Sequence, residues 1–468
     1  MYTKEDIFSF FQASAAKRTV WKRRNYYYHR LMALYFRFLI PEGAKVLEVG
    51  SGTGELLAAV KPLNGLGIDF APNMTAIAGK QFPELRFETM DIEEAAPDEE
   101  FEYVIMSDVV GSLWDVQAAF GNLRKVMDSH SRIIISHYNF LWQPTVRLLE
   151  FLHLKARQPL QSWLSRRDII RLLEIEGFEC IRTMRKVLFP ARIPLINWFF
   201  NTFLANLPLL SHLCLVNFIV ARKSGEPARD RSVSIVIPAR NEKGNIENAI
   251  LRTPSFGTGQ EFIFIEGHSK DGTYDEMLRV KEKYPDHRIK VARQTAIGKA
   301  NAVREGFEMA EGEVLIILDA DLTTPPEDMP KFYEAIRQNR GEFINGSRLV
   351  YPMEEEAMRT LNYLGNKIFS WFFSYLLEQQ VKDTLCGTKV LLKSDYEKIK
   401  ANRSYFGEFD PFGDFDLLFG ASKLNMKITE IPVRYRQREY GSTQISKFRH
   451  GWLLIRMSLF AAVKIRFI

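Results

Sequence analysis

The chain has 468 residues, which at about 100–200 residues per domain predicts more than one domain. Hydrophobic residues make up 46% and charged residues 26%, a composition that excludes collagen-like, coiled-coil and disordered classes. The 63 basic and 57 acidic residues give a net charge of +6, which is too balanced to favour a nucleic-acid partner.

The 3 cysteines are widely spaced and contain no C-x-x-C pair. This pattern excludes a disulfide framework and a structural zinc site, and it favours a reducing compartment. The first residues, MYTKEDIFSFFQ, lack the apolar core of a secretory signal. The stretch 193–220 has no Asp, Glu, Lys or Arg, but prolines and asparagines interrupt it, so we expect no transmembrane helix and a cytoplasmic location.

Short apolar runs alternate with helix-length segments along the chain, which predicts an α/β protein with parallel sheets. Strands are expected in the first half at 45–49, 65–69, 85–87, 103–106, 133–137 and 213–220. They are expected in the second half at 233–237, 261–265, 290–292 and 314–319. Between the halves, RKSGEPARDR lacks apolar periodicity. We therefore predict a domain at 1–224, a linker at 225–231 and a second domain at 232–468.

The first predicted strand runs into a glycine-rich loop with the sequence KVLEVGSGTG. Alternating Gly50, Gly52 and Gly54 let the backbone turn tightly and approach a ligand. The dinucleotide fingerprint G-x-G-x-x-G is absent, because Glu55 takes the place of its third glycine. The loop therefore predicts a ligand site of a different class.

Acidic residues follow the next two strands. Asp69 ends the second strand, where a carboxylate can accept both ribose hydroxyls, and Asp91 follows the third, where it can accept from an adenine amino group. With the loop, these residues resemble the class I S-adenosylmethionine-dependent methyltransferases over roughly residues 20–222. The resemblance implies a Rossmann-like sheet and S-adenosylmethionine as cofactor. The residues implied to bind it are Glu48, Gly50, Gly52, Gly54, Asp69, Asp91, Ile92 and Ser107.

Methyl transfer needs an oriented nucleophile and, for a hydroxyl acceptor, a base. His137, at the end of the fifth predicted strand, is the candidate base, with a purely structural histidine as the alternative. The segment 25–29, NYYYH, is expected either to cover the cofactor or to pack its aromatic rings in the core. The sequence does not identify the methyl acceptor.

In the second half, polar residues follow the predicted strands in order. Pro238 is expected to end the first of these strands and to expose the turn Arg240–Glu242 at its carboxyl edge, where ligands bind in open α/β sheets. The next strand is followed by Glu266 and Asp271. We expect these side chains to share one edge of a sheet.

The strand 314–319 ends in Asp319-Ala-Asp321. Two carboxylates that flank one residue after a buried strand can hold a hard divalent cation, Mg²⁺ or Mn²⁺, beside a diphosphate. Such pairs also occur in ordinary surface turns. Here the pair continues a series of strand-end motifs, which favours the metal site.

Together these motifs resemble glycosyltransferase family 2, with a GT-A fold, and most closely its dolichyl- or polyprenyl-phosphate sugar synthase branch, over roughly residues 232–468. The resemblance implies a UDP- or GDP-linked nucleotide-sugar donor and a metal at Asp319 and Asp321. The family's second strand commonly ends in two aspartates where Glu266-Gly267 stands here, so the nucleoside stays open. The donor-binding residues implied are Pro238, Arg240, Asn241, Glu242, Glu266, Asp271, Lys299, Asp319 and Asp321.

The segment FGDFDLL aligns with a family helix start that supplies the base. The alignment implies Asp414 as base and Asp416 as its support; the alternative is a carboxylate that only favours the helix dipole. A lipid-phosphate acceptor needs no base, and Asp414 would then position it. The acceptor or phosphate contacts implied are Arg348, Lys389, Arg436, Arg438 and Ser442.

Arginines at 434, 436 and 438 alternate, so on a strand they would share a face suited to phosphate. The alternative is a solvated basic face. The segment 451–468, with three cations and no acid, and the aromatic segment 368–377 are expected either at an anionic membrane surface or in core or dimer contacts.

We conclude from the sequence that the chain is a bifunctional enzyme that transfers methyl groups and sugars, with polyprenyl phosphate as a candidate acceptor and peripheral membrane contact. Two alternatives remain open. The methyltransferase-like half could be a degenerate docking module beside an active glycosyltransferase, or the whole chain could be a non-enzymatic membrane scaffold.

Overall fold

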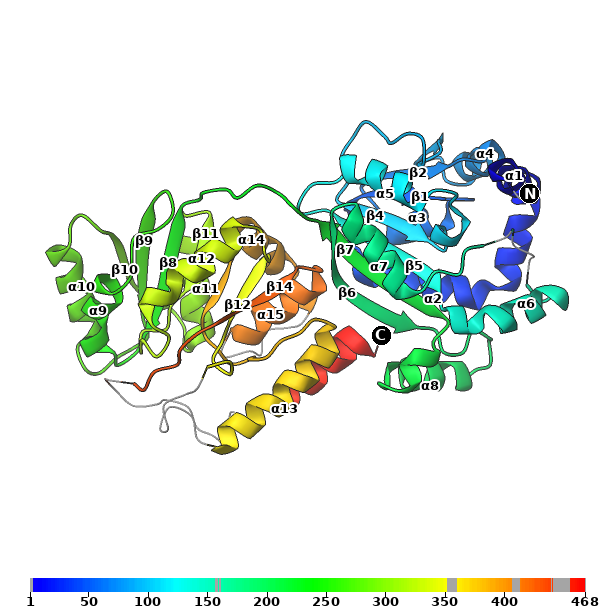
Figure 1. The fold of residues 1–468 in the computed structure, drawn as a ribbon. Coiled ribbons are helices and arrows are strands. Elements are labelled where there is room, and N and C mark those ends of the chain that lie inside the picture. Colours follow the sequence, from blue (N-terminus) through cyan, green and yellow to red (C-terminus); the bar gives the residue numbers. More distant parts are fainter. Residues whose placement is uncertain are drawn as a thin grey trace. The chain divides into compact units, whose positions relative to one another are not determined.

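The computed structural model describes residues 3–155, 159, 161–351, 360–405, 413–438, 440 and 455–467. Contacts divide the chain into two compact units. The N-terminal unit comprises Met1–Gly225 with the last two residues, and the C-terminal unit comprises Glu226–Arg466. Each unit is built on its own seven-stranded sheet (Figure 1).

The N-terminal sheet has the order β3-β2-β1-β4-β5-β7-β6. Its first five strands in the chain run parallel, and β7 is antiparallel to both β5 and β6. The order reverses at β1, which has β2 on one side and β4 on the other, and open α/β sheets bind ligands at such a point. The strands are β1 (Lys45–Val49), β2 (Asn64–Asp69), β3 (Arg86–Thr89), β4 (Tyr103–Ser107), β5 (Arg132–Tyr138), β6 (Phe178–Lys186) and β7 (Val216–Lys223).

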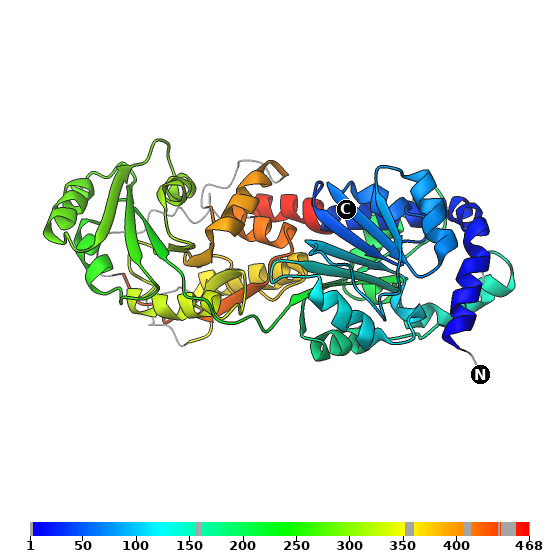
Figure 2. The same cartoon turned by 90° about the horizontal axis from the view of Figure 1, so that it is seen from above.

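Helices cover both faces of this sheet (Figure 2). The helix α1 begins with a capping box, in which the Thr3 hydroxyl accepts from the Asp6 N–H and the Asp6 carboxylate accepts from the Thr3 N–H. The helices are α1 (Lys4–Arg24), α2 (Tyr26–Leu39), α3 (Glu55–Val60), α4 (Pro72–Gln81), α5 (Val116–Lys125), α6 (Gln143–Phe151), α7 (Arg166–Ile175) and α8 (Ile196–Thr202). Short 3₁₀ turns are η1 (Val110–Ser112), η2 (Phe140–Trp142), η3 (Leu204–Asn206) and η4 (Leu210–Leu213).

The C-terminal sheet has the order β10-β9-β8-β11-β13-β12-β14. The strand β13 is antiparallel to both of its neighbours, and the other pairings are parallel. The order reverses at β8, between β9 and β11. The strands are β8 (Val233–Ala239), β9 (Gln260–Glu266), β10 (Arg288–Arg293), β11 (Val314–Ile317), β12 (Phe343–Ser347), β13 (Lys389–Leu392) and β14 (Ile428–Pro432).

The helix α11 packs on β8 and β9, and α12 packs on β12 and β13. The helices of this unit are α9 (Ile246–Leu251), α10 (Thr273–Lys283), α11 (Lys299–Met309), α12 (Met329–Arg337), α13 (Thr360–Leu377), α14 (Lys393–Ala401) and α15 (Asp414–Lys423). Shorter turns are η5 (Lys243–Asn245), η6 (Pro326–Asp328), η7 (Arg403–Tyr405) and a π-helical turn, η8 (Ala462–Arg466), which continues a helix at 455–461. In the part of the chain that the structure describes, no helix is long and apolar enough to span a bilayer.

The predicted α/β class is confirmed, and each strand expected from the sequence has a counterpart, though some bounds differ. The strand expected at 213–220 begins only at Val216, because Leu210–Leu213 forms a 3₁₀ turn. Four strands were missed: β6, β12, β13 and β14.

The prediction that Pro238 ends its strand was wrong, because β8 continues to Ala239 and pairs Pro238 with Ile265 of β9. The backbone oxygen of Val236 accepts from Leu318 on the β11 side, so Pro238, two residues later, faces the same side. There β11 has already ended at Ile317, and no strand requires the N–H that proline lacks.

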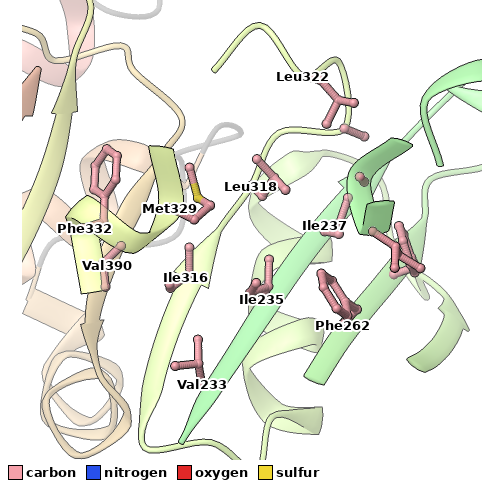
Figure 3. Close-up of a cluster of buried hydrophobic side chains, with 14 of the residues drawn as sticks. Val233, Ile235, Ile237, Phe262, Ile316, Leu318, Leu322, Met329, Phe332 and Val390 are labelled. Atoms are coloured by element: carbon pink, nitrogen blue, oxygen red, sulfur yellow. The ribbon is translucent and has the colours of Figure 1, made fainter. Parts of the chain in front are cut away.

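The core of the C-terminal unit is organised by β8, whose Val233, Ile235 and Ile237 point into one buried cluster (Figure 3). Alternate residues of a strand share a face, which explains the spacing of two. The same cluster receives Phe262 from β9 and Ile316 from β11. Each such side chain contributes about 1.5–3 kcal/mol when fully buried, so this cluster fixes β8 at the centre of the sheet.

We expect Ile235→Ala to lower the free energy of unfolding of the C-terminal unit by about 2–5 kcal/mol, because it leaves a cavity between β9 and β11. Differential scanning calorimetry of the full chain should show the transition of this unit at lower temperature and that of the N-terminal unit unchanged. Leu251→Ala, at an exposed position of α9, is the matched control. If Ile235→Ala melts like the parent, as the control should, Ile235 does not contribute this stability to the core.

Candidate functional sites

A cavity of about 1310 Å³ lies at the carboxyl ends of β1, β2 and β4 in the N-terminal unit. Its wall includes Glu48, Gly50 and Ser51 of the β1–α3 loop, and residues of α1 and α2. At Gly50, with φ of 67°, a Cβ would approach the Cγ2 of Val109 to 2.5 Å, so only glycine lets this loop pass so close to the β4 end. The position of the loop therefore leaves the space beside it open to a ligand.

Two buried carboxylates shape this loop. Glu48 accepts from the Leu57 N–H at 2.9 Å, and burial raises the pKa of Glu48 to about 8. Asp69 accepts from the N–H groups of Gly52 at 2.9 Å and Ala71 at 3.0 Å, and burial raises its pKa. Both carboxylates line the cavity. Hydrogen bonds from the backbone thus hold them in place, and among the described residues no side-chain cation forms an ion pair with either.

The other residues predicted to bind the cofactor lie in the same cavity wall. Asp91 follows β3 and forms an ion pair at 2.7 Å with Lys4 of α1. Ile92 is buried beside it, and Ser107 at the end of β4 contacts the Ser136 hydroxyl at 3.2 Å. The structure therefore brings strand-end residues from β1 to β4 together around one space.

His137 lies elsewhere. It does not line the cavity, and its buried ring contacts the Asn217 side chain at 3.4 Å. Burial, with a contribution from Arg166, lowers the pKa of His137 to about 4. Successive residues of a strand face opposite sides, and Ser136 takes the side facing Ser107 and Asp108. This placement favours the structural alternative for His137.

The Ser107-Asp108 pair ends β4, the usual position for contacts to cofactor and substrate in the family that this half resembles, and Asp108 faces the cavity. Asp108, at φ of 56°, accepts from the Tyr28 hydroxyl at 2.7 Å, and the ring of Tyr138 lies 6.1 Å from that of Tyr28. All three residues line the cavity, and burial raises the pKa of Asp108. The only sequence signal was their place at the ends of β4 and β5 and in the NYYYH segment, which thus both packs and lines the cavity.

The helix α1 contributes basic side chains that carry no motif. Arg18 lines the cavity, and its Nε atom is buried without a hydrogen-bond partner. A Cβ added at Gly52 would lie 3.4 Å from that atom, so Arg18 reaches the glycine loop. Lys22 contacts the Thr53 hydroxyl at 3.0 Å. These two cations face the end of the cavity at which the loop lies.

In the C-terminal unit, the turn after β8 interlocks with the turn after β9. The Asn241 N–H donates to the Ser269 hydroxyl at 2.9 Å, and its side-chain oxygen accepts from the Lys270 N–H at 2.8 Å. Asp271 accepts from the Lys243 N–H at 3.2 Å, and Glu266 accepts from the Ser269 N–H. The structure thus joins the predicted β8 and β9 motifs, with Arg240 exposed at the same turn.

Arg438 connects this edge to the D-x-D segment. Its guanidinium donates to Glu242 at 2.9 Å and to Asp321 at 2.6 Å. Glu242 is buried, and burial raises its pKa to about 7 although Arg438 acts in the opposite direction. Two carboxylates from different strand ends thus share one cation.

Asp319 has a different cation, the Lys299 ammonium at 2.6 Å, supplied by the first residue of α11. Burial by itself would raise the pKa of Asp319, but Lys299, with Lys389 and Arg348 nearby, holds it below its ordinary value. A Cβ at Gly387 would overlap the Asp319 carboxylate, so the backbone before β13 approaches as closely as glycine permits.

The donors present suit a divalent cation that shares its shell with a substrate. Within the described ranges, no group of three or more His, Cys, Asp or Glu side chains is placed to hold a metal by itself. Mg²⁺ is commonly bound by one or two carboxylates plus substrate phosphates and water. Asp319 and Asp321 supply such a pair, though each is ion-paired in this structure.

Two of the predicted acceptor contacts, Arg348 and Lys389, have partners within the protein. Arg348 forms a two-pronged ion pair with the buried Asp383, at 2.7 and 2.8 Å. The buried Lys389 donates to the Cys386 carbonyl. The first pairing joins the end of β12 to the segment before β13, and the second joins the start of β13 to the turn that precedes it.

The three alternating arginines are not on a strand, because β14 ends at Pro432. Arg434 and Arg436 are exposed, and only Arg438 turns toward the carboxylates. Asp416 of α15 is buried between Arg304 at 2.9 Å and Arg403 at 3.0 Å. Asp414 is the first residue of α15, but its side chain lies outside the described residues, as does the whole of Ser442.

Comparison with known proteins finds two families in one chain. Residues 20–183 match the model of a methyltransferase domain, and residues 234–399 match that of glycosyl transferase family 2. A dolichol-phosphate mannosyltransferase of Pyrococcus furiosus is 29% identical over 233 residues, which is 46% of this chain and 59% of that protein. An undecaprenyl-phosphate 4-deoxy-4-formamido-L-arabinose transferase of Salmonella paratyphi B is 25% identical over 47% of this chain and 64% of that protein.

Among solved structures, a SAM-dependent methyltransferase, possible histamine N-methyltransferase, from Thermotoga maritima is similar to 47% of this chain and 100% of its own, with 16% identity and a TM-score of 0.38. The matches to the two curated relatives span less than two thirds of the length of each. The family matches show that a methyltransferase domain and a family 2 glycosyltransferase domain are both present, so the chain carries two transferase domains.

The raised pKa of Glu48 makes the stability of the N-terminal unit depend on pH in a defined direction. The folded state holds this proton more tightly than the unfolded state, so the contribution is fully present below the ordinary value of 4.5 and is lost as the pH rises to about 8. Glu48→Gln keeps an oxygen for Leu57 and does not ionise. We therefore expect Tm of the variant minus Tm of the parent to increase from about pH 5 to about pH 8.5 in calorimetry of the ligand-free protein.

Glu42→Gln is the control, because Glu42 is an exposed carboxylate paired with Lys61. Its Tm difference should stay nearly constant over the same range. A constant difference for Glu48→Gln would contradict the raised pKa.

Proposed function

We propose that the two transferase domains make a bifunctional enzyme. The N-terminal unit would transfer a methyl group from S-adenosylmethionine, and the C-terminal unit would transfer a sugar, with inversion, from a nucleotide sugar to polyprenyl phosphate. The observation that carries the proposal is the convergence of strand-end carboxylates in both units: Glu48 and Asp69 at one sheet, Glu242, Asp319 and Asp321 at the other.

The N-terminal cavity supports binding of S-adenosylmethionine. Asp69, Asp91 and Ile92 line the cavity; Asp69 would accept from the ribose hydroxyls, and Asp91 with Ile92 would border the adenine. Arg18 and Lys22, beside the glycine loop, would attract the carboxylate of the methionine part, and the unpartnered Nε of Arg18 supplies a donor for it.

The cofactor supplies an already activated methyl group, so the protein has to orient the acceptor and accept a proton. Asp108 could accept it, because it lines the cavity next to Ser107 and its carboxylate accepts a hydrogen bond from the Tyr28 hydroxyl. Burial raises its pKa, which makes it a stronger base than an exposed aspartate. We propose this role for Asp108 in place of the earlier candidate, His137.

In the C-terminal unit, Asp319 and Asp321 would hold a divalent cation together with the donor diphosphate. That cation would neutralise charge on the departing nucleoside diphosphate. Asp271 and the turn at Asn241 would contact the nucleoside, as the family resemblance implies. Polyprenyl phosphate as acceptor is supported by the names of the two curated relatives, which act on dolichol phosphate and undecaprenyl phosphate.

A thermal-shift screen of the full chain tests both halves at once. The ligands are S-adenosylhomocysteine, UDP and GDP, the nucleotides with and without Mn²⁺. A ligand present at about 100 times its Kd stabilises the folded state by about 2.7 kcal/mol, which is readily measured. We expect S-adenosylhomocysteine and one nucleotide with Mn²⁺ to raise Tm. If a nucleotide raises Tm but S-adenosylhomocysteine does not, the N-terminal unit would be a docking module. If no ligand raises Tm, the proposal would be overturned.

For the N-terminal site, we expect Asp69→Ala to weaken S-adenosylhomocysteine binding at least about tenfold in calorimetric titration, a loss of about 1.4 kcal/mol. The reason is the loss of the acceptor for the ribose hydroxyls. Asp98→Ala, at an exposed carboxylate, is the matched control and should bind like the parent. Because Asp69 also holds the Gly52 N–H, Tm is measured as well. Unchanged affinity at unchanged Tm would remove the ribose role.

For the C-terminal site, we expect Asp321→Asn to abolish the Mn²⁺-dependent part of the nucleotide stabilisation and to slow sugar transfer about 100-fold, since a metal supplies several kcal/mol of charge stabilisation. Asp275→Asn, on the exposed side of α10, is the control. If the Asp321 variant keeps parental metal-dependent transfer, the metal is not held there.

A further inference from the structure

Two segments of the N-terminal unit carry exposed large apolar side chains. They are α6 and the segment from Arg192 to Leu213 that contains α8; both helices are labelled in Figure 1. We name this the apolar surface and define it by Phe151 of α6 and by Leu195, Trp198 and Leu209, which are 71%, 79%, 56% and 87% exposed. Leu148 and Phe199 extend it. A monomeric soluble domain rarely leaves side chains of this size together in water, so the surface indicates a partner.

Hydrogen bonds join the two segments into one structure. The Trp142 indole N–H, next to the start of α6, donates to the Leu213 carbonyl at 2.8 Å. The Asn139 side chain donates to the carbonyls of His212 at 2.9 Å and Cys214 at 3.0 Å. The exposed apolar side chains therefore belong to one tied region rather than to two independent loops.

The positive charge around this region indicates which kind of partner it would bind. No acidic residue occurs between Glu179 and Glu226, whereas Arg192 and, on α6, Arg147 are exposed. The one acidic residue of α6, Glu150, is ion-paired with Lys155. A second copy of this surface would bring arginines against arginines. An anionic lipid bilayer supplies both the apolar phase and the opposite charge, and tryptophan favours its interface.

The same segments also form part of the cavity wall. Val146 and Leu149 of α6 line the cavity, as do Pro190 and Ala191 just before Arg192. We infer that the apolar surface docks the N-terminal unit on an anionic bilayer, so that the methyl acceptor is a lipid or lipid-linked molecule that reaches the cavity from the membrane. The acceptor class rests on the proposed methyl transfer, whereas the docking does not.

The test is flotation of the ligand-free full chain with vesicles of phosphatidylcholine, with and without phosphatidylglycerol. The variant carries Phe151→Ser, Trp198→Ser and Leu209→Ser, all exposed positions whose loss should leave Tm unchanged. We expect its partition onto anionic vesicles to fall at least about tenfold, because membrane affinity grows with the apolar area buried. Arg192→Glu should weaken binding to anionic vesicles only.

The control variant carries three exposed apolar positions elsewhere, Leu63→Ser, Leu251→Ser and Ile297→Ser, and should float like the parent. The docking proposal would be overturned if the variant with Phe151→Ser, Trp198→Ser and Leu209→Ser floated like the parent, or if the parent chain did not float at all. A parent dimer that becomes monomeric in this variant would also overturn it, since the surface would then join two copies. Calorimetric titration with S-adenosylhomocysteine separates the proposals: a parent chain that binds S-adenosylhomocysteine but does not float with anionic vesicles refutes only the membrane surface.

Discussion

Both sites depend on how buried carboxylates at strand ends are compensated. Removing a carboxylate from water is costly, and the surrounding structure must return hydrogen bonds or opposite charge. In the N-terminal unit the compensation comes from backbone N–H groups, as for Glu48 and Asp69, and the pKa values stay raised. In the C-terminal unit it comes from the cations Lys299 and Arg438. The two sites therefore differ in whether backbone N–H groups or side-chain cations surround their carboxylates.

The two forms of compensation suit different ligands. Carboxylates fixed by backbone donors keep acceptor capacity for neutral hydroxyl groups, such as those of a ribose, and need no rearrangement when one binds. Carboxylates paired with side-chain cations can exchange one cation for another as the side chains rotate away. The sheets place both arrangements where the strand order reverses, at β1 and at β8, because crossover connections leave a crevice there.

The sequence predicted most of what the backbone determines. Strand ends that carry glycine or carboxylates, such as Gly50, Asp69 and Asp319, have local signatures and lie at the expected sheet edges. Three kinds of feature escaped. The short or late strands β12 to β14 have weak periodicity. The hydrogen bond from Tyr28 to Asp108 joins residues 80 positions apart, and the surroundings of His137 depend on which face of β5 it occupies. Each of these features depends on contacts between residues that are far apart in the sequence, so no local sequence pattern predicts it.

The shared guanidinium of Arg438 has a consequence for how the C-terminal site would respond to ions. Arg438 already forms ion pairs with Glu242 and Asp321, so a metal ion bound by Asp321 would compete with the guanidinium for that carboxylate. The apparent affinity for the metal ion would therefore be the difference between its attraction to these carboxylates and that of Arg438. The displaced guanidinium could then bind the anion that accompanies the metal ion. Because a divalent cation carries two positive charges and Arg438 one, each exchange would add one net positive charge at these carboxylates.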